Sequence, residues 1–212
     1  MQALTAIGEV GIEAGGRSYL LRPSLFSMTR IGSPAEIIEA FVLLTGSEPV
    51  VLHPYLLPDL AKNWRRDRFR IALNVLHACS DEDLTPLVGG MSGYRRYSPG
   101  AMPIDDIVAV ARSLIIHGVV GAAKPDTTRP VTDADYMTEF KAAEYAATAI
   151  AHLGASEQEA WHMTMTSFSA AMRSKFPPDP KQANAPKPHT ASEYDATMAR
   201  LKKINAARAA RA

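Results

Sequence analysis

The sequence has little that points to disulfides, membranes or export. It contains one cysteine, Cys79, so no disulfide can form within the chain and we expect a reducing compartment. No run of about 18 apolar residues occurs, so no ordinary membrane-spanning helix is expected. The N-terminal segment lacks the basic start and long apolar stretch of a signal peptide. We therefore expect the protein to remain where it is made.

Patterns of common catalytic and cofactor sites are also missing. The six histidines form no H-E-x-x-H arrangement, and no P-loop, G-x-S-x-G or strand-bound G-x-G-x-x-G motif is present. His77 and Cys79 precede acidic residues, but no second Cys/His pair stands at zinc spacing. We expect no catalytic residue, no cofactor and no metal, and the protein is not expected to be an enzyme.

Charge gives only a weak indication of a partner. The net charge of +1 does not favour a polyanion, and 47% of the residues are hydrophobic, which is typical of a globular protein. Residues 177–212 carry seven Lys/Arg against three Asp/Glu. This basic end is compatible with an acidic partner surface, and also with a helix end that only improves solubility.

A β-hairpin is predicted at the N-terminus. Gly15-Gly16 suits a two-residue turn, because glycine readily adopts the positive φ that such turns require. Pairing outward from the turn places apolar pairs on one face and Glu9 opposite Arg22 on the other. The apolar pairs are Ile12 with Tyr19 and Val10 with Leu21. A lone hairpin is only marginally stable, so it should pack on helices or on another subunit.

Helical periodicity follows the hairpin. Residues 33–36 form a capping box with Pro34 at the first helical position. This predicts a helix with Ile37, Phe41 and Leu44 on one face, ended by Gly46. A longer helix is predicted over residues 57–77, with the charged residues 65–68 on its exposed side, and residues 80–100 are predicted as a loop. A helix over 104–117 is expected to bury Ile104, Ile107, Val108, Ala111, Leu114 and Ile115, with Gly118 and Gly121 ending it.

The second half is predicted to be helical too. A long helix over residues 133–153 would place Met137, Phe140, Ala143, Ala147 and Ile150 along one side, and Gly154 would end it. Residues 156–159 form a second capping box, followed by a further helix start at Thr164 or Thr166. A third box at 190–193 begins a basic amphipathic helix after five prolines in residues 177–189.

These elements predict a mainly α (α+β) fold, in which an N-terminal β-hairpin packs on a helical bundle. The predicted parts are the hairpin plus helical domain (1–121), a linker (122–132), a C-terminal helical part (133–176), a Pro-rich tether (177–189) and an amphipathic tail helix (190–212).

Two apolar helix faces are the candidates for partner binding. The first lies on the helices around residue 161 and the second on the tail helix. Their residues are Trp161, Met165, Phe168 and Met172 in the first, and Tyr194, Met198 and Leu201 in the second. Such a stripe belongs to the core more often than to a binding groove, and periodicity alone does not separate the two.

Two segments resemble proteins of tailed-phage and prophage tail gene clusters. The opening hairpin with Arg22-Pro23-Ser24 and the following Ile31-Gly32-Ser33-Pro34-Ala35-Glu36-Ile37 is similar to the start of small proteins from these clusters. The segment His152-Leu153-Gly154 with Glu159-Ala160-Trp161-His162-Met163-Thr164-Met165-Thr166-Ser167-Phe168 resembles the tail assembly chaperone pattern L-G-(few)-a-W-x-M-T-x-x-E-F. Ser167 departs from it, because the pattern has an acidic residue there. The resemblance covers roughly residues 8–45 and 75–176.

This resemblance implies a non-catalytic tail assembly chaperone that coats the tape measure protein during tail assembly. It implies the host cytoplasm as location, a homo-oligomer, and the tape measure protein as partner, with the tail tube protein as a further candidate. Membrane and nucleic acid are not expected as partners. The alternatives are a structural minor tail or connector protein retained in the virion, and a nucleic-acid-binding regulator that uses the basic tail helix.

Overall fold

The computed structural model describes residues 3–48, 58–92, 96–122 and 137–177. Residues 1–124 and 132–177 belong to one compact unit, and residues 125–131 and 178–212 to a second. The second unit lies outside the described residues. The predicted tail helix also lies outside them, and so do all but the first residue of the predicted linker and of the predicted tether.

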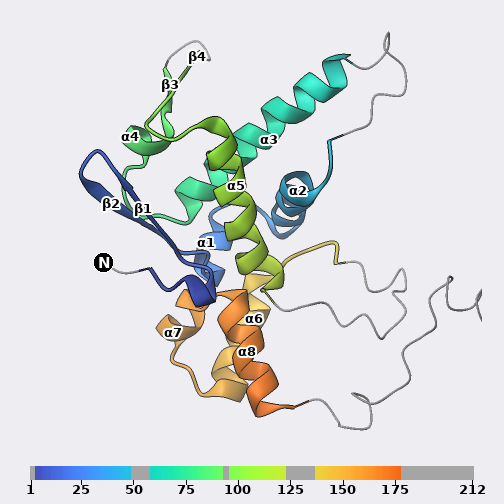
Figure 1. The fold of residues 1–212 in the computed structure, drawn as a ribbon. Coiled ribbons are helices and arrows are strands. Elements are labelled where there is room, and N and C mark those ends of the chain that lie inside the picture. The colour runs from blue at the N-terminus through green and yellow to red at the C-terminus, as the bar shows by residue number, and fades with distance from the viewer. Residues whose placement is uncertain (1–2, 49–57, 93–95, 123–136, 178–212) are drawn as a thin grey trace, which may run out of the picture. The chain divides into compact units, whose positions relative to one another are not determined.

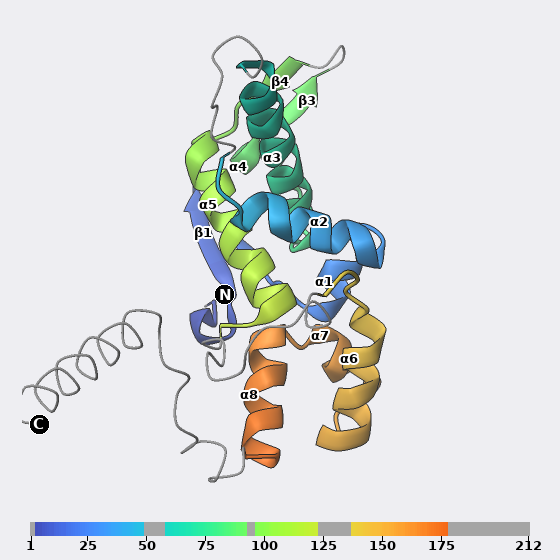
Figure 2. The same ribbon diagram turned by 90° about the vertical axis from the view of Figure 1, so that its right-hand side faces the viewer.

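The fold is mainly helical with two small hairpins, as the sequence predicted for the class (Figures 1 and 2). In chain order the elements of the first half are η1 (Thr5–Ile7), β1 (Val10–Ala14), β2 (Arg17–Leu21), α1 (Leu25–Thr29), α2 (Pro34–Thr45), α3 (Pro58–Ala78), α4 (Thr85–Val88), β3 (Gly90–Ser92) and β4 (Arg96–Ser98). Those of the second half are α5 (Ile104–Ile115), the π-helical turn η2 (Ile116–Val120), α6 (Ala142–Thr148), the π-helical turn η4 (Ala149–Leu153), α7 (Glu157–His162) and α8 (Met165–Lys175).

The N-terminal hairpin has the predicted register. β1 and β2 are antiparallel, with Val10 paired to Leu21 and Ile12 to Tyr19, and both turn glycines have positive φ. Glu9 and Arg22 form an ion pair at its N-terminal end, and the Glu9 carboxylate is buried. The Glu9 side chain is 2% exposed. Its carboxylate accepts a hydrogen bond from Arg22 Nε at 2.5 Å and another from the backbone N–H of Leu4 at 2.9 Å. The N-terminal turn and the strand end are thereby joined through one buried carboxylate.

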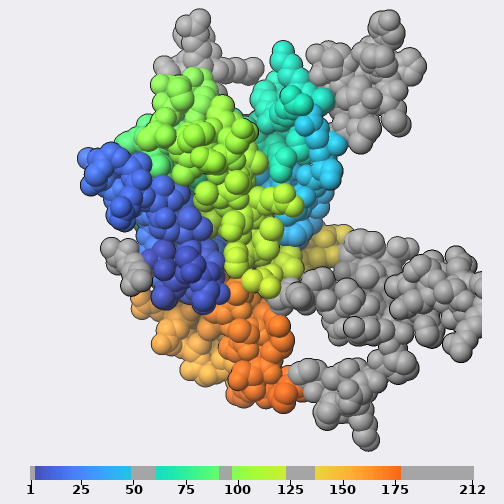
Figure 3. Space-filling model, viewed as in Figure 1, coloured from blue at the N-terminus to red at the C-terminus, as the bar shows by residue number. Residues whose placement is uncertain are grey.

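The core lies where α5 packs against α3, and α2 contacts both helices. The buried side chains of α5 are Ile107, Ala111, Leu114 and Ile115, and those of α3 include Ala72, Val75 and Leu76. Ile104 was predicted to be in this core, but it is 48% exposed, because it lies at the first position of α5, beyond the edge of the buried face. Figure 3 shows α5 on the surface between the hairpin and the α2–α3 region.

Helices on both sides of the predicted linker share this core. α1 packs against α6 and α7, and α8 packs against η2. The backbone joins them too, because the N–H of Leu25 donates to the carbonyl of Met163 at 2.9 Å. The N-terminal domain and the C-terminal helical part that the sequence separates therefore belong to one unit.

Three local predictions were wrong. Residues 80–100 contain α4 and the β3–β4 hairpin, elements too short for a period to be recognised. Residues 137–141 are not helical, because the N–H of Phe140 donates to the carbonyl of Pro34 and holds this segment beside α2. α6 therefore begins at Ala142, and the buried residues of α6 and η4 are Ala142, Ala146 and Ala149 instead of the predicted Ala143, Ala147 and Ile150. Of the other two residues predicted on that face, Phe140 is buried and Met137 is exposed.

Helix ends were predicted better than helix faces. Ser33 and Ser156 form capping boxes with Glu36 and Glu159, and Thr164 caps α8. The hydrogen bonds from Ser33 and Ser156 lower the pKa values of the Glu36 and Glu159 carboxyls. Gly118 does not end its helix as predicted. It lies within η2, where the sulfur of Met28 occupies the space that a Cβ would need.

Like Glu9, His117 joins separate segments of the chain. Its Nδ1 lies 2.8 Å from Thr166 Oγ1 on α8, and the same hydroxyl accepts the N–H of Ala122 at 3.1 Å. A Cβ built on Gly8 would lie 2.3 Å from the His117 ring, so the N-terminal turn packs directly on the imidazole. This burial lowers the pKa of His117 below its ordinary value. The neutral imidazole thus joins η2, α8 and the N-terminal turn.

We expect Arg22→Ala to lower the free energy of unfolding by about 3 kcal/mol, because it leaves the Glu9 carboxylate buried without its cation. Glu9→Gln should cost less, about 1 kcal/mol, since an amide is easier to bury than a charge. Urea denaturation measures both. Arg17→Ala, an exposed change in the same hairpin, should stay within about 0.5 kcal/mol. Equal effects of Arg22→Ala and Arg17→Ala would contradict a stabilising role of the pair.

Acid should weaken the fold through His117. Because its folded pKa lies below its unfolded value, the unfolded chain binds more protons, and stability is lost as the pH falls below about 6.5. Urea midpoints measured between pH 7.5 and pH 5.5 should therefore decrease, and His117→Asn should flatten this dependence. His77→Asn, at an exposed histidine, should keep the wild-type slope. An unchanged slope in His117→Asn would exclude this residue as the cause.

Candidate functional site: an apolar groove along α2

α2 is apolar on two faces, although a helix at the surface of a core needs only one. The sequence of its 12 residues, PAEIIEAFVLLT, contains two charged residues, Glu36 and Glu39. Ile37, Ala40 and Leu44 are fully buried against the core. A helix that is apolar all round is normally covered all round. The second face of α2 is instead open to solvent.

This open face forms the floor of a groove. Ala35, Ile38, Glu39, Val42 and Leu43 lie at the i, i+3, i+4, i+7, i+8 spacing of one helix face and line a groove of about 550 Å³. Val42 is 60% exposed, the highest exposure among the large hydrophobic residues of the described chain. We call this surface the α2 groove.

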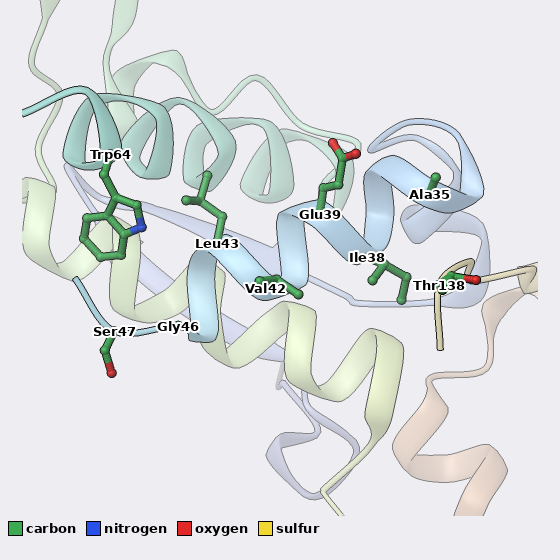
Figure 4. Close-up of a pocket in the computed structure, with 9 residues that line it drawn as sticks. All are labelled: Ala35, Ile38, Glu39, Val42, Leu43, Gly46, Ser47, Trp64 and Thr138. Carbon is green, nitrogen blue, oxygen red and sulfur yellow. The ribbon is translucent and has the colours of Figure 1, made fainter. Parts of the chain in front are cut away.

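The two ends of the α2 groove come from other parts of the chain. Trp64 of α3 lies at one end and Thr138 at the other, while Ile38 and Val42 point to the same side of α2 between them (Figure 4). Thr138 is brought there by the hydrogen bond from Phe140 to Pro34. The groove therefore combines three segments that are far apart in the sequence.

The Trp64 end is held by arginines. The Arg68 guanidinium lies 4.8 Å from the Trp64 ring, and its Nη2 donates to the carbonyl of Leu44 at 2.9 Å at the end of α2. Arg68 was predicted on an exposed side, and it turns inward because the last carbonyls of α2 need donors. Arg65 pairs with Glu48 at 2.6 Å, and this contact raises the pKa of Arg65. The Arg68 guanidinium thus connects the indole with the end of α2.

The first stripe predicted to bind a partner lies mainly in the core. Met165 and Phe168 are 6% and 7% exposed, and the Phe168 ring packs edge-on against Tyr145. Trp161 and Met172 are partly buried and pack against the same core. The stripe is divided between α7 and α8 by the cap at Thr164. In the single chain Met165 and Phe168 are not accessible to a partner.

The second predicted stripe, Tyr194, Met198 and Leu201, lies outside the described residues. Partner binding by either stripe stays a prediction.

Sequence reasoning overlooked the α2 groove because it assigned one apolar face, Ile37, Phe41 and Leu44, to this helix. The signal was present in the neighbouring apolar residues Ile38 and Val42, which continue the apolar surface around the helix. Only the packing of α3 and α5 shows which of the two faces is covered.

The described residues contain no cluster of side chains that could hold a metal ion. No group of three or more His, Cys, Asp or Glu side chains lies at metal-binding distance within this part of the chain. Cys79 is buried, and burial raises the pKa of its thiol to about 12, so the nucleophilic thiolate does not form near neutral pH. None of the helices in the described ranges is long and apolar enough to cross a bilayer.

Comparison with known proteins gives one match. The model of a family described as "Family of unknown function (DUF6246)" matches residues 21–196, which include the α2 groove and the helices around Trp161. No curated protein and no solved structure matches this chain.

Core and groove residues should respond differently to truncation. Phe168→Ala is expected to lower the free energy of unfolding by about 3–4 kcal/mol, because it removes a buried ring. Val42→Ala should change it by less than about 0.5 kcal/mol, because the side chain is mostly in water already. Urea denaturation of both variants measures the difference. A comparable loss in Val42→Ala would mean that the groove residue is part of the core.

Proposed function

The chain belongs to DUF6246, a family of unknown function, and we propose that it acts as a non-catalytic tail assembly chaperone of a tailed phage or prophage. Its client is the tape measure protein, and its site of action is the host cytoplasm. The α2 groove is the surface that receives the client.

The open second face of α2 is the observation that carries this proposal. A fixed apolar strip of helical spacing, with an indole at one end, matches the way in which proteins bind an amphipathic helix in a groove. A tape measure protein is a long helical chain whose apolar faces are exposed until the tail tube encloses it. A chaperone for such a client must bind through apolar surface and with little dependence on the client's sequence, so it does not need a closely shaped pocket.

The resemblance of the segment around Trp161 to tail assembly chaperones supports the same function. The structure gives this segment a position in the core, beside α1 and α6. We infer that the motif maintains the fold that presents the α2 groove, and that contact with the client falls to α2 and Trp64. The chaperone motif and the client-binding surface are then two different parts of the molecule.

Co-expression with a tape measure protein of a tailed phage or prophage tests the proposal. The wild-type chain should keep the tape measure protein soluble and co-purify with it. Val42→Lys should abolish both effects, because a charge on the groove floor would have to be desolvated when a helix docks. Soluble tape measure protein and its co-purification are measured by sedimentation of the lysate and affinity capture.

Val120→Lys is the matched control. Val120 is 51% exposed and lies in η2, outside the α2 groove, so the same substitution there should leave the client soluble. Circular dichroism should show both variants folded. The proposal fails if the wild-type chain leaves the tape measure protein insoluble, or if the chain is abundant in mature virions by mass spectrometry. Equal loss of client in the two valine variants would exclude the α2 groove as the binding surface.

A further inference from the structure

Glu39 stands out within the α2 groove because of its charge. It is the only ionisable residue among those that line the groove in the described part of the chain. Its side chain is exposed, and it lies between Ala35 on the preceding turn and Val42 and Leu43 on the next. A carboxylate thus lies on the Leu43 side of an otherwise apolar strip, with Ile38 and Val42 on the other side of α2 (Figure 4).

The other carboxylates near the groove are already engaged. Glu36 accepts the backbone N–H of Ser33 at 2.7 Å in the capping box of α2. Glu48 pairs with Arg65 at 2.6 Å. Glu139, next to Thr138, lies 3.6 Å from the amino group of Lys141. Glu39 forms no ion pair with any residue that the structure describes.

A helix that covers the apolar strip also covers Glu39 and removes water from its carboxylate. Burial of an unpaired charge is unfavourable by several kcal/mol, whereas a cation opposite it recovers much of that cost. An apolar residue opposite Glu39 would thus be rejected, and an acidic one more strongly. The groove would therefore select the charge of the bound helix at the position opposite Glu39, whereas its other contacts accept any apolar side chain.

We propose that the helix bound in the α2 groove carries a lysine or arginine opposite Glu39, inside its apolar stripe. This inference rests on the proposed function, because it takes the α2 groove to be a helix-binding surface. The spacing of Ala35, Val42 and Leu43 around Glu39 sets the pattern of the partner. Its cation is flanked by apolar residues three or four positions away on either side.

Two designed peptides test the charge rule directly. Both are fluorescein-labelled, alanine-based helices of about 18 residues with a leucine stripe. They differ at one central stripe position, which is lysine in the first and glutamate in the second. Fluorescence anisotropy with the full chain should show that the lysine peptide binds about tenfold more tightly at low salt, a preference that decreases as salt is added.

Substitutions at Glu39 should change this preference in a defined way. Glu39→Gln should remove most of it, and Glu39→Lys should reverse it in favour of the glutamate peptide. Glu13→Gln, at an exposed glutamate of the N-terminal hairpin, should leave the preference as in the wild type. These are surface changes, and thermal unfolding checks that each variant is folded.

The outcomes separate this inference from the proposed function. If both peptides bind equally to the wild-type chain, or if the preference survives Glu39→Gln, the charge rule is overturned while helix binding stands. If neither peptide binds, helix docking in the groove and the charge rule fail together. Sedimentation that shows a dimer dissociated by Val42→Lys would identify a second copy as the occupant and overturn the proposal.

Discussion

The packing of α5 against α3 is the contact on which the rest of the structure depends. Both helices are fully buried along this contact, and α2 lies against the pair. α5 continues through η2 into the region where Gly118 receives Met28 of α1 and where α8 packs. One apolar helix and its π-helical extension therefore contact both α1 and α8, and α1 in turn packs against α6 and α7.

This arrangement explains why α2 can present an apolar surface without loss of the fold. Its inner face, Ile37, Ala40 and Leu44, supplies the stabilising burial. Its outer face, Ile38 and Val42, contributes little, because much of that surface stays in water. Stability and the proposed client binding thus fall to opposite sides of one helix, so substitutions on the outer side are expected to alter binding alone. An apolar surface that costs solubility and adds little stability is typical of an interaction site.

The N-terminal junctions show how polar groups restrict the same core. The polar side chains of Glu9 and His117 lie where the ends of several helices and strands meet. Each joins separate segments through hydrogen bonds. Burial favours one protonation state of His117 and requires a cation for Glu9. Such groups fix which segments can pack together, because a wrong pairing would leave a polar atom unsatisfied.

Local interactions made much of the fold predictable. The hairpin register follows from the glycine turn and from alternation, so Val10–Leu21 and Ile12–Tyr19 were predicted pair by pair. Capping needs residues only three positions apart, and the starts of α2, α7 and α8 were therefore recognised. The helix expected over residues 133–153 is present from Ala142, but its predicted course through residues 137–141 was wrong, because Phe140 is held by Pro34, about a hundred residues earlier in the chain. No local pattern contains that contact.

The candidate site was less predictable from local sequence patterns than the fold. For the helices around Phe168 and for α2, the sequence pattern did not show which apolar face would be covered. The stripe of Met165 and Phe168 is buried because η2 packs on α8 and Tyr145 of α6 packs on Phe168. The second face of α2 is open because α3 and α5 pack on the other side. By itself, the sequence determined turns, caps and most helices, since these depend on neighbours within a few residues. Only the tertiary structure decided which apolar face meets water, because burial depends on segments that are distant in the sequence.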